Sequence, residues 1–293
     1  MRGSGPGSSR RRFRLAIPVV HLGLILLCPL ASWAQSYDVT LLDFPGAIDT
    51  FARGINQQGL VVGGYGLPGA PFRGFVYDGL FSDFVVPGSR ETQAWAINGA
   101  GHIVGRFQPE GGDIKGFLYD GAFTTIDFPG ATRTEALGIN ERGEVVGAYS
   151  STATHGFIYS KGTFSSIDVP GSLATFVFDI ASNGDFVGVY DDNLRRHGFI
   201  YRHGTYEDIS VPGSNETVPT SISDGGAIAG YATIATKTVG FIFLHGTFIL
   251  LDLPEATHGT RIFRMNTRGQ VVGDIDSGAR GFIATPIRQR KGK

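Results

Sequence analysis

Four aspartates at equivalent positions are the first residues in this sequence that could do chemistry. They lie two residues before a proline, at Asp43, Asp127, Asp168 and Asp252. A ring of carboxylates around an opening could provide general acid and base groups for cleaving a polysaccharide. An aspartate beside a Pro-Gly turn also commonly accepts hydrogen bonds from the turn backbone. We favour this second, structural interpretation, because repeated residues are typical of a scaffold.

Two histidines, His155 and His197, occupy equivalent positions and could form a metal-binding pair. No third ligand occurs at a related position, so a role at a strand edge is favoured. The acidic runs 191–193 and 274–276 lack the spacing and glycine of a calcium loop. The sequence also contains no nucleophile elbow, no H-E-x-x-H and no P-loop. We therefore expect no metal, no cofactor and no catalytic residue.

The elements that position these residues belong to a repeat of about 42 residues. Pro-Gly pairs recur in phase with an asparagine turn and a later Gly-Phe pair. The Gly-Phe pairs are Gly74-Phe75, Gly116-Phe117, Gly156-Phe157, Gly198-Phe199, Gly240-Phe241 and Gly281-Phe282. Six copies in phase indicate one structural unit repeated along the chain.

The sequence pattern of each copy predicts four short antiparallel strands. In the third copy we place them at 134–140, 144–149, 155–159 and 163–169, with a tight turn ending at Gly143. Two-residue turns such as Asp78-Gly79 favour a hairpin between the third and fourth strands. Apolar residues on consecutive positions, as in Val145-Val146, require both faces of a sheet to be buried. A radial β-propeller satisfies this requirement, because each blade packs between two neighbours.

The two ends of the repeat region complement each other. The last copy stops after its third strand, and residues 39–45 match the fourth strand at 123–129. The sequence therefore predicts an all-β, six-bladed propeller with four antiparallel strands per blade, closed by one N-terminal and three C-terminal strands. One threonine recurs in every copy, which predicts a structural hydroxyl bonded to the backbone. These threonines are Thr50, Thr92, Thr134, Thr175, Thr217 and Thr260.

The N-terminus has the pattern of an export signal. A basic segment at 10–14 precedes an apolar run at 15–30, which is shorter than the ~20 residues of a spanning helix. Small residues favour cleavage after Ala34, and Ser9-Arg10-Arg11-Arg12-Phe13 resembles a twin-arginine signal. We expect a signal peptide at 1–34, one propeller domain at 35–287 and a basic tail at 288–293. The mature form is expected to be secreted or periplasmic, monomeric and without a stable membrane span.

The cysteine content and the net charge exclude disulfides and argue against some classes of partner. The only cysteine, Cys28, lies in the signal segment, so the mature chain would have no disulfide. The chain has 25 basic and 26 acidic residues, and five of the basic ones lie in the first 34 residues, which hold no acidic residue. The remainder is acidic overall, which argues against nucleic acid as a partner.

The repeat resembles the HAF-type extracellular repeat family of bacterial proteins. The resemblance rests on Gly138-Ile139-Asn140, Val145-Val146-Gly147 and His155-Gly156-Phe157-Ile158-Tyr159, and it covers nearly the whole mature chain. The His-Ala-Phe of the family is His-Gly-Phe here, and only His155 and His197 keep the histidine. The resemblance implies export and a propeller, and it implies no particular activity.

Loops between the second and third strands differ most among the copies, and variable loops on a regular scaffold are common recognition sites. The candidate ligand-binding residues are Phe72, Phe107, Arg195, Arg196, His155 and His197. We expect a non-catalytic exported scaffold that binds a protein or a glycan through these loops. The alternative is an extracellular polysaccharide hydrolase or lyase that uses the carboxylates at the channel mouth. Neutral drift of exposed loops would also produce such variation.

Overall fold

The strand and turn pattern of the third copy shows how the sequence forms its sheets. In the computed structural model, its strands are β12 (Arg133–Ile139), β13 (Val145–Ser150), β14 (Thr154–Ser160) and β15 (Thr163–Ile167). The Asn140 side-chain oxygen accepts hydrogen bonds from the backbone N–H groups of Arg142 and Glu144, both at 3.0 Å. Gly143 has a φ of 77°, which favours glycine, so the turn forms where the sequence predicts it.

The structure describes residues 10–12, 19–20 and 36–287. Four strands pair antiparallel in succession in each sheet, and the strands outside the third copy have the following bounds. They are β3 (Tyr37–Leu42), β4 (Asp49–Ile55), β5 (Val61–Gly66), β6 (Arg73–Tyr77), β7 (Phe81–Phe84), β8 (Ser89–Ile97), β9 (Ile103–Pro109), β10 (Lys115–Tyr119), β11 (Phe123–Ile126), β16 (Ala174–Ile180), β17 (Phe186–Asp191), β18 (Arg196–Arg202), β19 (Thr205–Ile209), β20 (Glu216–Ile222), β21 (Ile228–Ile234), β22 (Lys237–Leu244), β23 (Thr247–Leu251), β24 (Thr260–Met265), β25 (Val271–Ile275) and β26 (Arg280–Pro286). A single 3-10 turn, η1 (Asp276–Gly278), joins β25 to β26.

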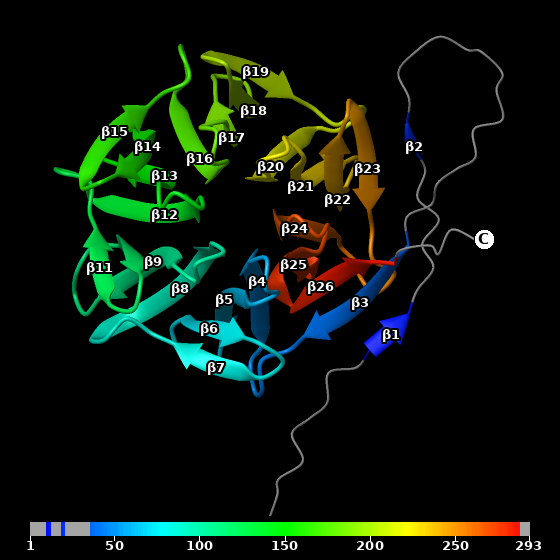
Figure 1. The fold of residues 1–293 in the computed structure, drawn as a ribbon, viewed down its shortest axis with the longest axis horizontal. Coiled ribbons are helices and arrows are strands. Elements are labelled where there is room, and N and C mark those ends of the chain that lie inside the picture. The colour runs from blue at the N-terminus through cyan, green and yellow to red at the C-terminus, as the bar shows by residue number, and fades with distance from the viewer. Residues whose placement is uncertain (1–9, 13–18, 21–35, 288–293) are drawn as a thin grey trace, which may run out of the picture.

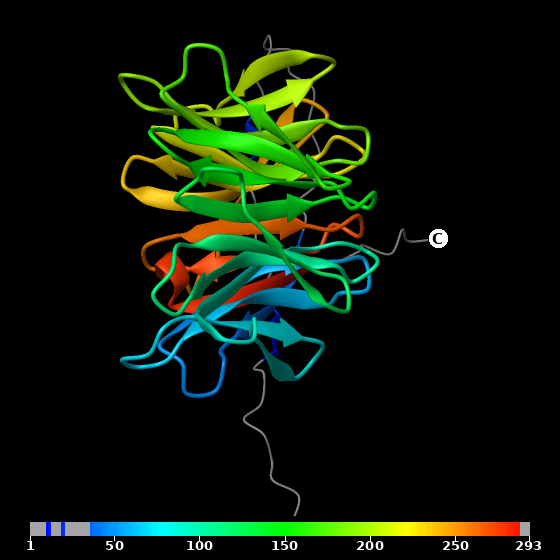
Figure 2. The same ribbon diagram turned by 90° about the vertical axis from the view of Figure 1, so that its left-hand side faces the viewer.

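These sheets stand around a central axis (Figure 1). The first strand of each copy lies innermost, and these strands are β4, β8, β12, β16, β20 and β24. In the view from the side, the strands run between two faces formed by turns and loops (Figure 2). Two neighbouring sheets are joined by one parallel residue pair, Thr154 with Ala174. The prediction of an all-β fold is confirmed, and the sheets of four strands are consistent with the predicted repeat unit.

The N-terminal and C-terminal segments share a sheet. Strand β3 pairs antiparallel with β26, with Leu42 opposite Gly281 and Tyr37 opposite Pro286. The order of this sheet is therefore β3, β26, β25 and β24 from the outside inward. The Asn266 side-chain amide also donates to the Asn56 carbonyl oxygen at 3.0 Å, which links residues 210 positions apart.

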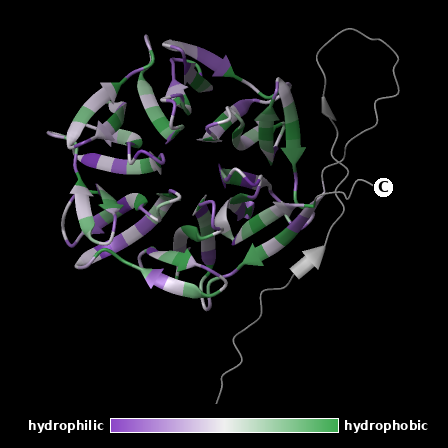
Figure 3. Ribbon diagram, in the orientation of Figure 1, coloured by the Kyte–Doolittle hydropathy of each residue, from purple (hydrophilic) through white to green (hydrophobic). Residues whose placement is uncertain are grey.

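The apolar core lies between neighbouring sheets. One cluster joins Ala96 and Val104 of one sheet to Val145 and Phe157 of the next, and all four side chains are buried. Hydrophobic residues accordingly run through every sheet (Figure 3). The phenylalanines of the six Gly-Phe pairs are fully buried, and so are Val145 and Val146, which lie on opposite faces of β13, so this sheet is covered on both faces.

The recurring threonine has the predicted structural role. Each of the six hydroxyls accepts a hydrogen bond from a backbone N–H that precedes it by six or seven residues, at 2.9–3.1 Å. In the third copy, for example, Phe128 donates to Thr134. The bond fixes the loop that leads into each innermost strand, because a buried N–H needs an acceptor.

Two of the predicted segments fall almost entirely outside the described residues. Of the expected signal peptide at 1–34, the structure describes only β1 (Arg10–Arg12), which pairs with β3, and β2 (Val19–Val20), which pairs with β23. The expected basic tail at 288–293 lies outside the described residues. No helix within the described ranges is long and apolar enough to cross a membrane.

Candidate functional site: the central channel

Every innermost strand carries a β-bulge at the same place. The strand register shifts by one residue there, so one side chain leaves the regular alternation. We call these six bulged residues the collar. They are Arg53, Trp95, Leu137, Phe178, Thr220 and Phe263. All six line one cavity of about 130 Å³ inside the channel, which we call the collar cavity.

A larger cavity of about 400 Å³ lies on the side of the loops between the second and third strands. We call it the loop-side cavity. It shares Arg53, Trp95, Leu137 and Phe178 with the collar cavity, so the two are adjoining parts of one channel. Its outer wall includes Phe72 and Arg196 from the variable loops. Aromatic rings together with a few polar groups are the usual lining of a small-molecule site.

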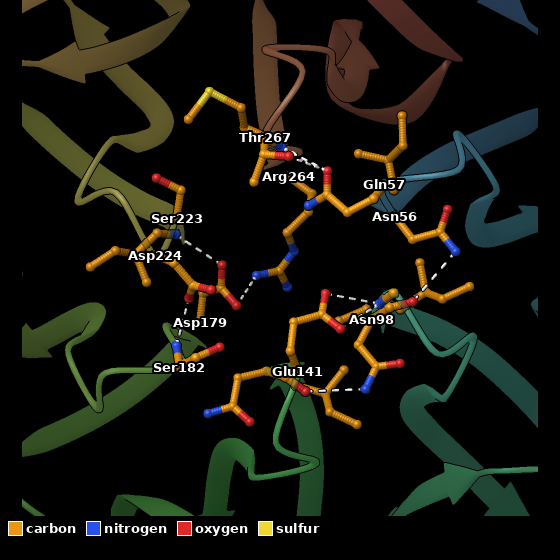
Figure 4. A pocket seen from close by; sticks show the side chains of 18 of the residues that line it. Asn56, Gln57, Asn98, Glu141, Asp179, Ser182, Ser223, Asp224, Arg264 and Thr267 are labelled. Carbon is orange, nitrogen blue, oxygen red and sulfur yellow. Dashed lines mark hydrogen bonds and ion pairs between the residues drawn. The ribbon is translucent and has the colours of Figure 1, made fainter.

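An ion pair crosses the channel below the collar. Arg264 Nη1 lies 2.5 Å from Asp179 Oδ1, and Arg264 Nη2 donates to the Leu137 carbonyl oxygen at 2.9 Å. Figure 4 shows Arg264 reaching from its strand toward Asp179. Both side chains are buried. Burial raises the pKa of Asp179, and the Arg264 guanidinium and the Ile222 backbone N–H oppose that rise.

On the opposite face, a polar cavity of about 330 Å³ lies between the asparagine turns (Figure 4). Its carboxylates are engaged with backbone groups of neighbouring sheets. Glu141 accepts from the Gly99 N–H at 2.9 Å, and Asp224 accepts from the Ser182 N–H at 2.7 Å. These contacts tie one sheet to the next, so Glu141 and Asp224 already have structural partners.

Phe72 and Arg196, two of the residues predicted from the loops, border the loop-side cavity. Phe72 is half-buried and packs edge-on against Phe51, with ring centroids 5.6 Å apart. Arg196 is exposed and makes two bonds to the Asp191 carboxylate, at 2.8 and 3.0 Å. The structure therefore brings these two predicted residues, from different sheets, to one opening.

Phe107 and Arg195, also predicted from the loops, do not line the loop-side cavity. The expectation that Phe107 is exposed is wrong, because β9 continues to Pro109 and carries the Phe107 ring into the core beside Phe117. Arg195 is exposed, but it lines a small depression with His197 and Asp208 and neither of the two channel cavities, whereas Arg196 lines both this depression and the loop-side cavity.

Each of the two predicted histidines has a carboxylate partner within its own sheet. His155 Nδ1 lies 2.7 Å from Asp168 Oδ1, and its ring stacks on Tyr149. His197 Nε2 lies 2.9 Å from Asp192 Oδ2. Neither histidine lines the channel cavities. Within residues 10–12, 19–20 and 36–287, no cluster of His, Cys, Asp or Glu is suited to hold a metal ion.

The positions of the repeated aspartates agree with neither of the two interpretations drawn from the sequence. Three form ion pairs with a side chain of the strand next to them, which are Asp43 with Arg280, Asp127 with Lys115 and Asp252 with Lys237, and Asp168 lies within hydrogen-bonding distance of His155. They follow the outermost strands and do not line the cavities of the channel. The carboxylates near the channel are others, including Glu135 and Asp274, and each of these is paired with an arginine.

The collar was missed from sequence, although the sequence carries a signal for it. The collar residue stands three positions before the turn residue, which is asparagine in four of the six copies, as in Arg53-Gly54-Ile55-Asn56. Its type differs in nearly every copy, whereas a threonine stands three positions before it in all six. A position that breaks the repeat inside a regular strand therefore marks the channel wall.

Comparisons with known proteins bear on the fold. No protein-family model matches the sequence, and no curated protein matches it. Several solved structures resemble this chain in fold over most of their length. A streptogramin B lyase aligns with a TM-score of 0.54 and 14% identity, over 87% of this chain and 99% of that one.

The fold is a β-propeller.

Two further structures resemble this propeller at similar levels. A gluconolactonase from Xanthomonas campestris has a TM-score of 0.54 and 13% identity, covering 98% of this chain and 99% of its own. A lectin from Aleuria aurantia, in complex with Fucalpha1-6GlcNAc, has a TM-score of 0.51 and 10% identity, covering 84% and 98%. At these identities the likeness shows the fold and carries no activity to this chain.

Proposed function

We propose that this protein is an exported, non-catalytic binding protein that holds a glycan in the loop-side cavity. One observation carries the proposal: Phe72, Trp95, Phe176 and Phe178 line an opening that also contains arginine side chains. Aromatic faces pack against the C–H faces of sugar rings, and guanidinium groups donate hydrogen bonds to their hydroxyls.

The shape of the cavity favours a glycan over a protein. A stable protein–protein interface buries about 800 Å² on each partner over a broad surface. The loop-side cavity is a recess of about 400 Å³ in the middle of a ring, which suits one end or one unit of an oligosaccharide. The hydrolase or lyase alternative has less support, because the repeated aspartates that it requires are paired outside the channel cavities.

We further propose a closed ring of six blades in which β3 completes the last sheet, and membership of the HAF-type repeat group. The pairing of β3 with β26 and the hydrogen bond from Asn266 to Asn56 support the closed ring. The basic and apolar N-terminal segments support export to the periplasm or the exterior. The acidic body and the single ring support a monomer that does not bind nucleic acid.

A glycan array probed with the purified protein, followed by calorimetry on the best ligand, tests the binding function. Phe72→Ala and Trp95→Ala are each expected to weaken binding about tenfold, equivalent to about 1.4 kcal/mol. Leu80→Ala is the matched control, because Leu80 is 78% exposed on an outer hairpin and lines neither cavity. If no glycan bound, or if both aromatic variants bound as tightly as the wild type, the proposal would be wrong.

A further inference from the structure

Arg53 is surrounded differently from every other arginine of the channel. Five other arginines line the loop-side or collar cavity, and each has a carboxylate oxygen within 3.2 Å. The pairs are Arg106 with Glu91 and Glu135, Arg133 with Glu135, Arg196 with Asp191, Arg261 with Asp274, and Arg264 with Asp179. Among the described residues, no salt bridge and no side-chain hydrogen bond involves the Arg53 guanidinium, whose close contacts are with aromatic rings.

Aromatic rings hold Arg53 in place of an anion. Its guanidinium carbon lies 3.9 Å from the ring centroid of Phe263 and 4.7 Å from that of Trp95, with Phe51 at 5.0 Å. These contacts attract a cation to the faces of the rings. They leave the N–H donors at the edge of the guanidinium without a hydrogen-bond acceptor, because a ring face offers none in the guanidinium plane.

The position of Arg53 makes these donors available to a ligand. Arg53 lines both the loop-side cavity and the collar cavity, and it is only partly buried. Desolvation lowers the pKa of Arg53 to about 10, an effect that Asp274 opposes, so the side chain remains charged at neutral pH. Glu135 is the one carboxylate in the lining of the two cavities, and it is already shared by Arg106 and Arg133. The cavity therefore has an excess of positive charge at Arg53.

We infer that the Arg53 guanidinium is the anchor for a carboxylate of an acidic glycan, held where the loop-side cavity meets the collar. This inference rests on the proposed glycan-binding function and names its substrate class. A planar guanidinium fork matches a carboxylate with two parallel hydrogen bonds. Trp95, which lines both cavities, supplies an aromatic surface for the ring of the uronic acid.

Calorimetry with two matched sets of trisaccharides tests the inference on the full chain. One set contains trimers of galacturonate, glucuronate, mannuronate and guluronate, and the other contains the corresponding neutral trimers. We expect at least one uronate trimer to bind about tenfold or more tightly than its neutral counterpart. Arg53→Gln should abolish that difference, and Arg53→Lys should restore only part of it because lysine lacks the fork.

The control is Arg142→Gln, because Arg142 pairs with Glu144 and lines none of the channel cavities. It should leave the preference for uronates unchanged, and thermal unfolding should show that all variants are folded. Equal binding of acidic and neutral trimers would overturn the inference while leaving glycan binding intact. An unchanged preference in Arg53→Gln, or no binding of any uronate trimer, would also overturn it. Failure of every glycan on the array would instead reject the proposed function itself.

Discussion

Two arginines in the channel, Arg264 and Arg53, have opposite surroundings. The contrast distinguishes an arginine that stabilises the structure from one that is available to a ligand. Arg264 is buried, forms an ion pair with Asp179 and donates to the Leu137 carbonyl oxygen, so its charge is compensated between sheets. A buried ion pair is retained only when further hydrogen bonds support it, and the Ile222 N–H provides one to Asp179. Arg53 has no such partners. At the scale of single residues, the pairing of each charge identifies which side chain is available to a ligand.

Asp192 holds the loop that carries Arg195 and Arg196. Its Oδ1 accepts the backbone N–H groups of Arg195 and Leu194, at 2.8 and 2.7 Å, and its other oxygen bonds to His197. These bonds, first that from Arg195, lower the pKa of Asp192 to about 2.

The lowered pKa predicts acid sensitivity of this loop. Because the folded pKa is lower than that of the unfolded chain, the stabilisation is present above about pH 4 and is lost as the pH falls toward about 2. Amide hydrogen exchange of Leu194 and Arg195 should therefore accelerate over this range in the wild type. Asp192→Asn should show faster exchange at all pH values with little further change. Exchange in the wild type that did not depend on pH, beyond the intrinsic rate, would contradict the prediction.

Single residues were also where sequence reasoning was least reliable. Phe72 and Arg196 were found because they occupy loops that vary in length. Phe107 is misplaced from sequence because β9 continues four residues beyond Gly105, and the glycines of the turn that ends it, Gly111 and Gly112, follow only after Pro109. The pairing of the repeated aspartates with cations was missed because their partners lie 10 or more residues away and differ in type.

At the scale of elements, the bulge in each innermost strand supplies a side chain that lines the channel. It projects one non-repeated side chain per strand into the collar cavity, while the threonine three positions earlier recurs in every copy. The sequence could not show the bulge directly, because all copies contain it and the repeat length is unchanged. The four strands and their turns were predictable, since the glycines and the paired apolar residues recur in phase.

The second strand depends on a glycine at the place where it faces the bulge. A Cβ atom on Gly63 would overlap the carbonyl oxygen of Phe51 and lie 2.7 Å from Cζ of Phe75. Gly63→Ala should therefore lower the free energy of unfolding by about 1–3 kcal/mol or more. The adjacent Gly64→Ala is the matched control, because its nearest contact would be an ordinary 3.6 Å.

Urea unfolding of both variants measures the difference between these neighbouring positions. Gly64→Ala should stay within about 0.5 kcal/mol of the wild type. If Gly63→Ala were as stable as Gly64→Ala, the tight packing of the second strand between Phe51 and Phe75 would be contradicted.

At the scale of the whole molecule, the ring depends on contacts between segments far apart in sequence. Strand β3 covers the edge of β26, and the Ile287 N–H donates to the Ser36 carbonyl oxygen at 2.7 Å. This pairing could be anticipated, because the orphan strand at 39–45 matches the strand that the last copy lacks. The residues that line the channel could not be anticipated, because they depend on which side chains six separate strands bring together.

Removing β3 tests the dependence on closure. Its Val39, Leu41 and Leu42 side chains are buried, and burial of each such side chain contributes about 1.5–3 kcal/mol. Deletion of residues 36–43 should therefore lower the free energy of unfolding by several kcal/mol and expose the edge of β26, which promotes self-association. Deletion of residues 288–293 is the control, because it leaves β26 intact. A monomeric β3 deletion with wild-type stability, by light scattering and urea unfolding, would contradict this role.

The claim at the centre of this account is that the loop-side end of the channel binds the ligand. A crystal structure of the protein with the best glycan from the array tests it most directly. We predict density for a sugar in the loop-side cavity, in contact with Phe72 and Trp95 and within hydrogen-bonding distance of Arg53. Density only at the opposite face, beside Glu141 and Asp224, or on the outer strands would contradict the account.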